Sequence, residues 1–86
     1  MKIVILGMNG LIGNGIYTYL KNKNKITIYG SYRNKSKIRL NYNKKKHNIF
    51  RFDYRKNNFL ELTKKLSEIQ PNIIINCLGV TKHLLK

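Results

Sequence analysis

The start of the chain, where a short apolar run leads directly into three evenly spaced glycines, constrains the fold more than any other feature. Residues 2–6 are mostly apolar and rich in β-branched side chains, which favours a buried strand. Gly7, Gly10 and Gly13 follow, and apolar residues then recur at helical spacing. A strand, a glycine loop and a helix in this order are typical of the βαβ unit that binds dinucleotides. We therefore predict such a unit at the start of the chain.

Each of the three glycines has its own predicted role. Gly7 allows a sharp turn after the strand, because it has no Cβ to forbid a positive φ. Gly10 lets the backbone approach a pyrophosphate, Gly13 lets the helix pack close to the strand, and the first amides of the helix attract the phosphate charge. The alternative is a glycine-rich turn without a ligand. The predicted cofactor-binding residues of this segment are Gly7, Asn9, Gly10, Leu11, Ile12 and Gly13.

Strand and helix patterns alternate along the rest of the chain. The predicted elements are strands over residues 26–32, 49–52 and 73–77, a helix over residues 11–23, a helix that Asn57 or Asn58 caps and Pro71 stops, and short helical turns over residues 36–40 and 81–86. This alternation predicts an α/β fold with a Rossmann-type parallel sheet, in which four strands lie in the order 3-2-1-4 with helices on both faces. The ligand crevice is expected between the first and fourth strands, where the strand order reverses.

Length and cysteine content limit the class of protein. A chain of 86 residues forms at most one small domain of marginal stability. Cys77 is the only cysteine, which excludes an intrachain disulfide, fits a reducing cytoplasm and favours a buried apolar role for this side chain. His47 and His83 lack partners at metal-ligand spacing, so no metal site is expected. No apolar run approaches the roughly 20 residues of a membrane span, so we expect a cytoplasmic protein without a membrane partner.

The formal net charge of +15 by itself favours a nucleic acid or another anionic surface as partner. Two observations weaken that interpretation. Lys, Asn and Ile, whose codons are AT-rich, dominate the composition, and the lysines are scattered except for the run at residues 44–46. A basic nucleic-acid-binding module would also leave the glycine spacing and the regular strands without a role. This module and a non-functional truncated remnant are the two alternatives to a dinucleotide-binding protein.

Four segments together resemble one family. They read GMNGLIG at residues 7–13, YGSYR at 29–33, FDYR at 52–55 and QPNIIINCLGVTK at 70–82. On these motifs the chain resembles the extended short-chain dehydrogenase/reductase superfamily, in particular the sugar-nucleotide branch with the dTDP-4-dehydrorhamnose reductases and the NAD-dependent epimerase/dehydratases. The resemblance implies that residues 1–86 are the N-terminal NAD(P)-binding Rossmann half-domain of such a protein, so that the predicted sheet is incomplete.

The resemblance also implies how single residues meet the cofactor. Arg33 follows the second strand, where NAD-preferring relatives carry an acid, so the cofactor is expected to be NADP, assisted by Lys35, with NAD as second choice. Asp53 matches the position that faces the adenine, and Asn76 either contacts the cofactor or stabilises the strand end. The alternatives for Arg33 and Asp53 are a scattered surface cation and an ordinary turn residue. Outside the glycine loop, the implied cofactor-binding residues are Arg33, Asp53, Tyr54, Cys77, Leu78 and Gly79.

No catalytic residue is assigned. The proton donor of the family is the Tyr of a Tyr-x-x-x-Lys pair on a helix beyond the fourth strand. Tyr17 with Lys21 and Tyr42 with Lys46 have this spacing, but they fall in the helix after the glycine loop and in a basic loop, so we interpret both pairs as chance. Because the catalytic and substrate-binding portion is absent, we expect turnover of a nucleotide sugar only when that part is supplied.

The fourth predicted strand carries one more expectation. If the chain ends at Lys86, residues 73–77 form an edge strand with the uncharged, apolar sequence of a central strand. Exposed edges of this kind pair with other chains. We therefore expect marginal stability and self-association through this strand, opposed by the net charge at low salt.

Overall fold

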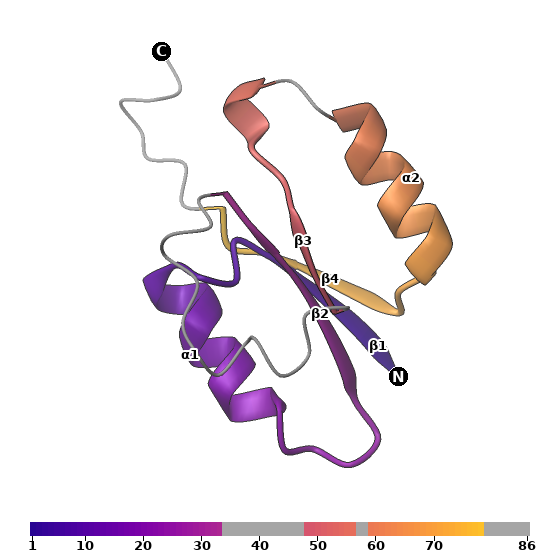
Figure 1. Ribbon diagram of the computed structural model, residues 1–86. Coiled ribbons are helices and arrows are strands. Elements are labelled where there is room, and N and C mark those ends of the chain that lie inside the picture. Colours follow the sequence, from indigo (N-terminus) through magenta and orange to yellow (C-terminus); the bar gives the residue numbers. More distant parts are fainter. Residues whose placement is uncertain (34–47, 57–58, 79–86) are drawn as a thin grey trace.

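Four parallel strands in the described part of the chain form one sheet in the order β3-β2-β1-β4, with a helix on each side of it (Figure 1). The computed structural model describes residues 1–33, 48–56 and 59–78. The elements are β1 (Lys2–Leu6), α1 (Leu11–Leu20), β2 (Thr27–Tyr32), β3 (Ile49–Arg51), the 3₁₀ turn η3 (Tyr54–Lys56), α2 (Phe59–Ile69) and β4 (Ile73–Asn76). The predicted α/β fold and its 3-2-1-4 order are confirmed.

Alternate side chains of β1 build the core on both faces of the sheet, because successive residues of a strand point in opposite directions. The buried cluster on the α1 side consists of Ile3, Ile5, Met8, Tyr17 and Ile28. The buried cluster on the α2 side consists of Val4, Leu6 and Ile69, with Leu62 and Leu66 packed against it. Full burial of an aliphatic side chain stabilises a fold by roughly 1.5–3 kcal/mol. The two clusters therefore hold the two helices on opposite faces of the sheet, as predicted.

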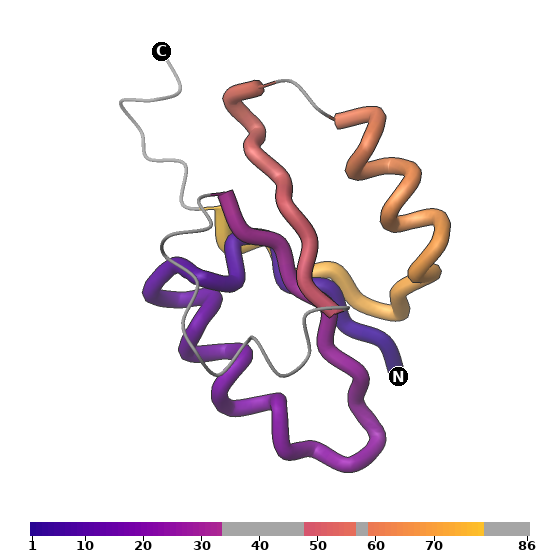
Figure 2. The backbone as a smooth tube through the Cα atoms, in the orientation of Figure 1, coloured from indigo at the N-terminus to yellow at the C-terminus, as the bar shows by residue number. Residues whose placement is uncertain are grey.

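Strand register places the loops that follow the four strands at one end of the sheet. In β1, Ile3 pairs with Ile28 of β2 and with Ile73 of β4, and all three strands run in the same direction. Figure 2 follows the chain from β1 through the glycine turn into α1 and back through β2. Because the strands are parallel, their carboxyl ends lie together, and the loops that follow β1, β2, β3 and β4 all begin at this carboxyl-terminal end of the sheet.

Helix α1 ends at Leu20, earlier than the predicted end near Lys23. The amide of Lys23 donates to the carbonyl of Leu20 at 3.0 Å, and the amide of Ile26 donates to the carbonyl of Lys23 at 3.2 Å, so the chain makes tight turns before β2. Asn22 and Asn24 lie in these turns, and asparagine favours turns because its side chain competes for backbone hydrogen bonds. The polar stretch of residues 22–25, which the sequence predicts to end the helix, forms these turns.

Helix α2 ends at Ile69, two residues before Pro71, in agreement with the prediction that this proline stops it. Gln70 takes a positive φ of 53°, and its amide donates to the carbonyl of Leu66 at 2.8 Å. This is a left-handed helix cap occupied by a residue other than glycine. Proline at the next position cannot continue the helix, because it lacks the amide hydrogen.

Strand β4 is less covered than its apolar sequence predicts. Ile73 and Ile74 are 42% and 48% exposed. In the described residues β4 pairs only with β1 and lies at the edge of the sheet, so the prediction of a strand covered on both faces is wrong for these two side chains. Asn76 ends the strand, because its Oδ1 accepts a hydrogen bond from the amide of Leu78 at 3.1 Å.

Some predictions lie outside the described residues. They are the helical turns over residues 36–40 and 81–86, the caps Asn57 and Asn58, and the side chains of Lys35, Tyr42, His47, Gly79 and His83. Within the part of the chain that is described, no helix has the length and apolar character needed to cross a bilayer.

Candidate dinucleotide-binding site

Two of the three loop glycines are required by the packing of the protein itself. Gly7 has a φ of +79°, and a Cβ there would overlap the carbonyl oxygen of Cys77 and lie 3.1 Å from the Cα of Leu78. A Cβ on Gly13 would overlap the carbonyl oxygen of Gly7. The turn of the loop, its contact with the residues after β4 and the approach of α1 to the loop therefore all depend on these missing side chains, as predicted for Gly7 and Gly13.

Gly10 differs, because the fold does not need a glycine at this position. Its φ of −79° and ψ of 175° are extended values that any residue adopts. A Cβ on Gly10 would meet only the carbonyl oxygen of Gly7, at an ordinary distance of 3.5 Å. Gly10 is exposed, so the volume that its side chain would fill is open to a group from outside the chain.

The start of α1 provides hydrogen-bond donors beside Gly10. The first amides of a helix have no acceptor within the helix, and Gly10, as the N-cap residue, has no side chain to cap this one; nor does any other side chain of the described residues cap it. Leu11 and Ile12 occupy the first turn with side chains 90% and 70% exposed, while Asn9 is half-buried. Aligned peptide dipoles make this end of the helix positive. The loop and the helix start thus offer the chemistry of an anion site.

Ser31 of β2 anchors the glycine loop to the sheet. Its Oγ accepts a hydrogen bond from the amide of Gly7 at 2.9 Å, and its carbonyl oxygen accepts one from the amide of Met8 at 2.8 Å. Ser31 is completely buried. The Met8 side chain in turn fills the space over Gly30, where a Cβ would overlap its sulfur atom. Sequence reasoning missed Ser31, although a small polar residue within an apolar strand is a visible signal.

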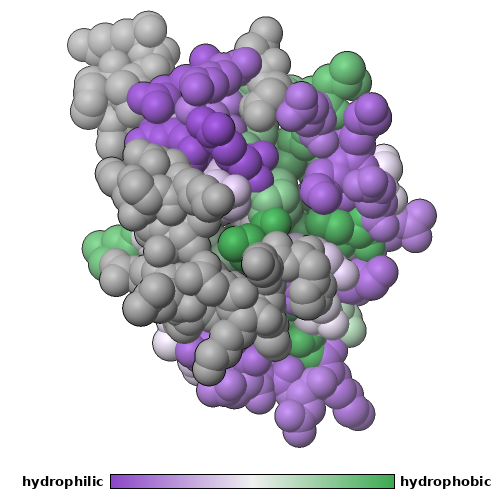
Figure 3. All heavy atoms as spheres, in the orientation of Figure 1, coloured by the Kyte–Doolittle hydropathy of each residue, from purple (hydrophilic) through white to green (hydrophobic). Residues whose placement is uncertain are grey.

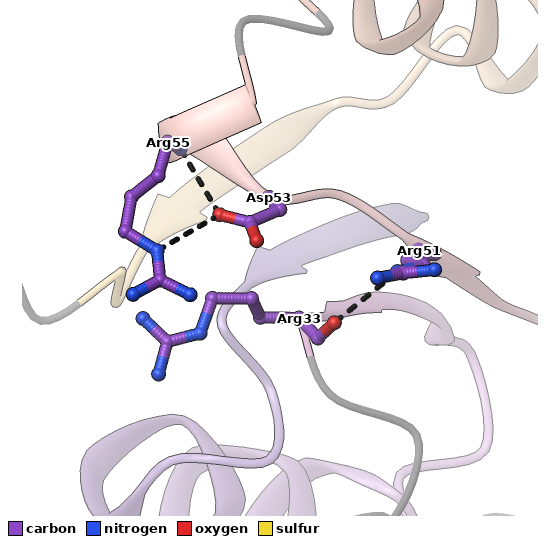
Figure 4. A network of polar contacts seen from close by, with 4 residues as sticks. All are labelled: Arg33, Arg51, Asp53 and Arg55. Atoms are coloured by element: carbon purple, nitrogen blue, oxygen red, sulfur yellow. Dashed lines mark hydrogen bonds and ion pairs between the residues drawn. The ribbon is translucent and has the colours of Figure 1, made fainter.

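Three arginines and one aspartate gather where β2 and β3 end (Figure 4). The pairing of these strands continues beyond β3, since the amide of Phe52 donates to the carbonyl of Tyr32 at 2.9 Å. A strongly hydrophilic surface covers this end of the sheet near η3 in the space-filling view (Figure 3). The four residues of this basic cluster are Arg33, Arg51, Asp53 and Arg55.

Asp53 organises the basic cluster. One of its oxygens, Oδ1, accepts hydrogen bonds from the amide of Arg55 at 3.0 Å and from Nε of Arg55 at 3.3 Å. Burial of the carboxyl raises its pKa, but the hydrogen bonds from Arg55 and the charges of Arg55 and Arg33 outweigh this effect, so the pKa of Asp53 lies below its ordinary value. Asp53 is therefore ionised at neutral pH. Sequence reasoning singled out Arg33 and Asp53 but missed Arg55.

Residues after β4 form the other wall of the glycine loop. The amide of Cys77 donates to the carbonyl of Leu6 at 2.8 Å, which brings the Cys77 carbonyl against Gly7. The Cys77 side chain packs against the α1-side core, and burial raises the pKa of its thiol. These observations agree with a packing role for the side chain rather than a reactive thiolate. Leu78 is half-buried and packs against the α2-side core.

Sequence-predicted site residues from three strand ends thus come together around the loop. Gly7 contacts the segment after β4 and hydrogen-bonds the end of β2, and the basic cluster begins two residues after Ser31. Tyr54 follows Asp53 in η3 and is half-buried. Tyr17, in contrast, is buried in the α1-side core, and burial raises the pKa of its hydroxyl, so it does not face this site.

Comparison with known proteins gives one result and two negative ones. A family model described as the NAD dependent epimerase/dehydratase family matches residues 3–85. Neither the curated proteins nor the solved structures include a match to this sequence. The family model spans nearly the whole chain, and the parallel sheet with its glycine loop is the architecture that the sequence motifs imply. The chain therefore belongs to the NAD dependent epimerase/dehydratase family.

Proposed function

We propose that this chain binds NADP in preference to NAD, at the glycine loop and the basic cluster. Family membership implies a dinucleotide cofactor. The observation that supports this site most directly is Gly10: the fold leaves its Cβ volume open beside the uncapped start of α1. The pyrophosphate would lie over Gly10, held by the amides of Leu11, Ile12 and Gly13.

The adenosine part would lie toward the ends of β2 and β3. Arg33 would pair with a 2′-phosphate, and Asp53 with Tyr54 would border the adenine. The one acid in this part of the site, Asp53, is already bound to Arg55, so its charge repels a phosphate less than a free carboxylate would. The nicotinamide half would lie on the β4 side of the loop, against Asn76, Cys77 and Leu78. We propose that Gly79 continues this wall of the site.

Isothermal titration calorimetry of the 86-residue chain with NADP and with NAD tests this proposal. We expect saturable binding of NADP, tighter than that of NAD, and loss of both in Gly10→Val, whose side chain would occupy the pyrophosphate volume. Gly15→Ala is the matched control, because a Cβ there has nothing within 4 Å and the residue lies elsewhere on α1. Absence of binding by wild-type protein that is folded by circular dichroism would overturn the proposal.

The substrate class is also part of the proposal. On the motifs given above, we infer that the complete enzyme is a sugar-nucleotide oxidoreductase of the dTDP-4-dehydrorhamnose reductase kind. None of the described tyrosines is proposed as its proton donor, so a nucleotide sugar becomes a partner only together with a catalytic portion. In-frame coding sequence beyond Lys86 that contains a Tyr-x-x-x-Lys pair would support this assignment, and addition of that portion should restore turnover.

Location and assembly complete the proposal. We infer a cytoplasmic location from the single cysteine, whose thiol is partly buried beside the core. We also infer that the isolated chain pairs with a second copy of itself through β4, whose Ile73 and Ile74 are exposed and whose sequence has no charge or proline to prevent strand pairing.

A nucleic acid is the competing partner, because the chain has a net charge of +15 and three arginines lie together where β2 and β3 end. When binding to a nucleic acid depends on counterion release alone, its affinity falls steeply as the salt concentration rises. We expect any electrophoretic shift of DNA or RNA to vanish near physiological salt while NADP binding persists. A nucleic-acid complex that survives that salt concentration would favour the competing function.

A further inference from the structure

In the basic cluster, two guanidinium groups are positioned like ligand-binding groups: that of Arg33 and, in addition, that of Arg55. The Arg33 side chain, in the described part of the protein, has no hydrogen bond or ion pair, although its charge acts on Asp53. In Figure 4 the guanidinium groups of Arg33 and Arg55 point to the same side of Asp53. The single negative charge of Asp53 offsets only one of the two positive charges, so the group keeps a net positive charge that attracts a further anion.

Asp53 fixes the backbone amide and Nε of Arg55 and leaves the two terminal guanidinium nitrogens available. Both hydrogen bonds from Arg55 to Asp53 end on Oδ1 and use the backbone amide and Nε. The ion pair therefore does not need the two terminal nitrogens, which carry most of the guanidinium donors. The Asp53 side chain is 4% exposed and the Arg55 side chain is 59% exposed, so a buried anchor holds an exposed cation.

Arg51 has a different position from the other two arginines. Its Nε donates to the carbonyl oxygen of Arg33 at 3.3 Å, on the opposite side of the Arg33 backbone from the paired guanidinium groups (Figure 4). This contact fixes the Arg33 backbone but directs the Arg51 guanidinium elsewhere. Arg51 thus supports the Arg33 backbone, and its guanidinium group does not converge with those of Arg33 and Arg55.

We propose that Arg33 and Arg55 together form a two-guanidinium clamp for a phosphate monoester, the 2′-phosphate of NADP, with Asp53 as the positioning residue that holds Arg55. The clamp rests on the proposed function and adds to it a second specificity-determining residue, which comes from η3 rather than from the end of β2. A phosphate monoester carries a charge of about −1.5 to −2 at pH 7. With Asp53 ionised, the two arginines keep a net positive charge that attracts this group, and planar guanidinium groups suit the oxygen geometry of phosphate.

Affinities for NADP and NAD, measured by calorimetry on the whole 86-residue chain, test the clamp. Arg55→Gln should weaken NADP binding about tenfold, as expected for loss of one charge-assisted contact, and change NAD binding less than about twofold. Lys64→Gln, at an exposed position of α2 outside the basic cluster, is the matched control: it removes one positive charge and should leave the NADP to NAD ratio unchanged. The same ratio measured with the fragments 2′,5′-ADP and 5′-AMP should respond in the same way, which separates the clamp from contacts to the nicotinamide half.

Asp53→Ala distinguishes positioning from simple electrostatics. Removal of a negative charge beside a phosphate should tighten NADP binding if only the net charge counts. The clamp predicts the opposite: NADP binding weakens more than NAD binding, because Oδ1, the acceptor of both hydrogen bonds from Arg55, is lost. In the Arg55→Gln background, Asp53→Ala should no longer weaken NADP binding relative to NAD binding.

The possible failures are separable. If Arg55→Gln weakens NADP and NAD equally, or if Asp53→Ala tightens NADP binding, the clamp is wrong while dinucleotide binding at the glycine loop stands. If the folded wild-type chain binds neither dinucleotide, the proposed function is wrong and the clamp fails with it. Circular dichroism of each variant verifies the fold; Arg55→Gln removes the side-chain bond to the buried Asp53 carboxylate but keeps the bond from the backbone amide.

Discussion

The amide of Gly7 donates a hydrogen bond to Oγ of Ser31 at 2.9 Å, and this contact joins the first loop glycine to the end of β2. The Ser31 carbonyl accepts a second bond from Met8, so two consecutive amides of the loop are bound to one buried residue. The shape of the glycine loop therefore depends on β2 as well as on its own glycines. Three strand ends, those of β1, β2 and β4, determine the geometry of one loop.

Loss of the Ser31 hydroxyl should destabilise the fold. Ser31→Ala leaves the part-buried amide of Gly7 without its acceptor, and an unsatisfied buried group costs about 1–3 kcal/mol. Urea denaturation measures the change. Ser67→Ala, at an exposed position of α2, is the matched control and should be neutral or slightly stabilising, because alanine favours helices. Equal effects of the two substitutions would show that the Ser31 bond contributes nothing.

Two glycines of α1 should respond to alanine with opposite signs. A Cβ on Gly15 meets nothing within 4 Å, so Gly15→Ala should stabilise the protein by roughly 0.5–1 kcal/mol through helix propensity. A Cβ on Gly13 would overlap the Gly7 carbonyl and lie 3.0 Å from the Cα of Met8, and overpacking of this kind costs about 1–3 kcal/mol. Chemical denaturation of both variants measures this. Stabilisation by Gly13→Ala would mean that α1 does not approach the loop this closely.

Arg33 should decide between the two cofactors. A charge-assisted contact to the 2′-phosphate contributes roughly 1.5–3 kcal/mol, so Arg33→Ala should weaken NADP binding about tenfold or more. NAD lacks this phosphate, and its affinity should hardly change. Titration calorimetry with the two cofactors provides the comparison. Equal losses would assign Arg33 to the fold or to the general positive field instead.

Asp53 should govern part of the acid sensitivity of the fold. The hydrogen bonds and charges that overcome its burial hold its pKa below the unfolded value of about 4, so the folded state binds this proton less readily than the unfolded state. The resulting stabilisation is complete above the unfolded pKa and is lost as the pH falls through the lower, folded pKa. In thermal melts between pH 7 and pH 2, Asp53→Asn should flatten the acid decline in stability.

Glu68→Gln is the control for the acid melts. The Glu68 side chain is 69% exposed and lies 4.0 Å from Lys65, a geometry in which ion pairs contribute little. Its variant should retain the acid decline of the wild type. If Asp53→Asn also lost stability in acid as steeply as the wild type, other groups would be the cause of the acid decline.

Strand β4 should make the isolated chain associate at high salt. Light scattering should detect dimers or larger species whose amount rises with protein concentration and with ionic strength, because salt screens the net charge. Ile74→Lys places a charge on the exposed edge and should suppress the association. Leu60→Lys, at a 76% exposed position of α2, should not. A concentration-independent melt of a strict monomer at high salt would contradict pairing through β4.

The sequence by itself determined the elements, the strand order and the glycine positions, because these features depend on short-range patterns. Apolar runs gave the strands, residues at helical spacing gave α1 and α2, and right-handed crossovers left one strand order. The turn at Gly7 could be predicted because a positive φ is a property of its own backbone, and Gly13 approaches a part of the loop only a few residues before it. The overlap of a Gly7 Cβ with Cys77, in contrast, follows from the pairing of β1 with β4. The last residue of the apolar spacing, Leu20, is also the last residue of α1, and turns that contain Asn22 and Asn24 follow it.

Only the tertiary structure decided which of these residues meet. Ser31 lies 24 residues from Gly7 in sequence, and the parallel pairing of β1 with β2 brings them together. Arg33 and Arg55 converge because β2 and β3 pair at their ends, and no spacing in the sequence encodes that contact. The exposure of Ile74 likewise depends on the position of β4 at the edge of the described sheet. Periodicity specifies which face of an element is apolar, whereas contacts between distant residues arise only when the strands adopt their register.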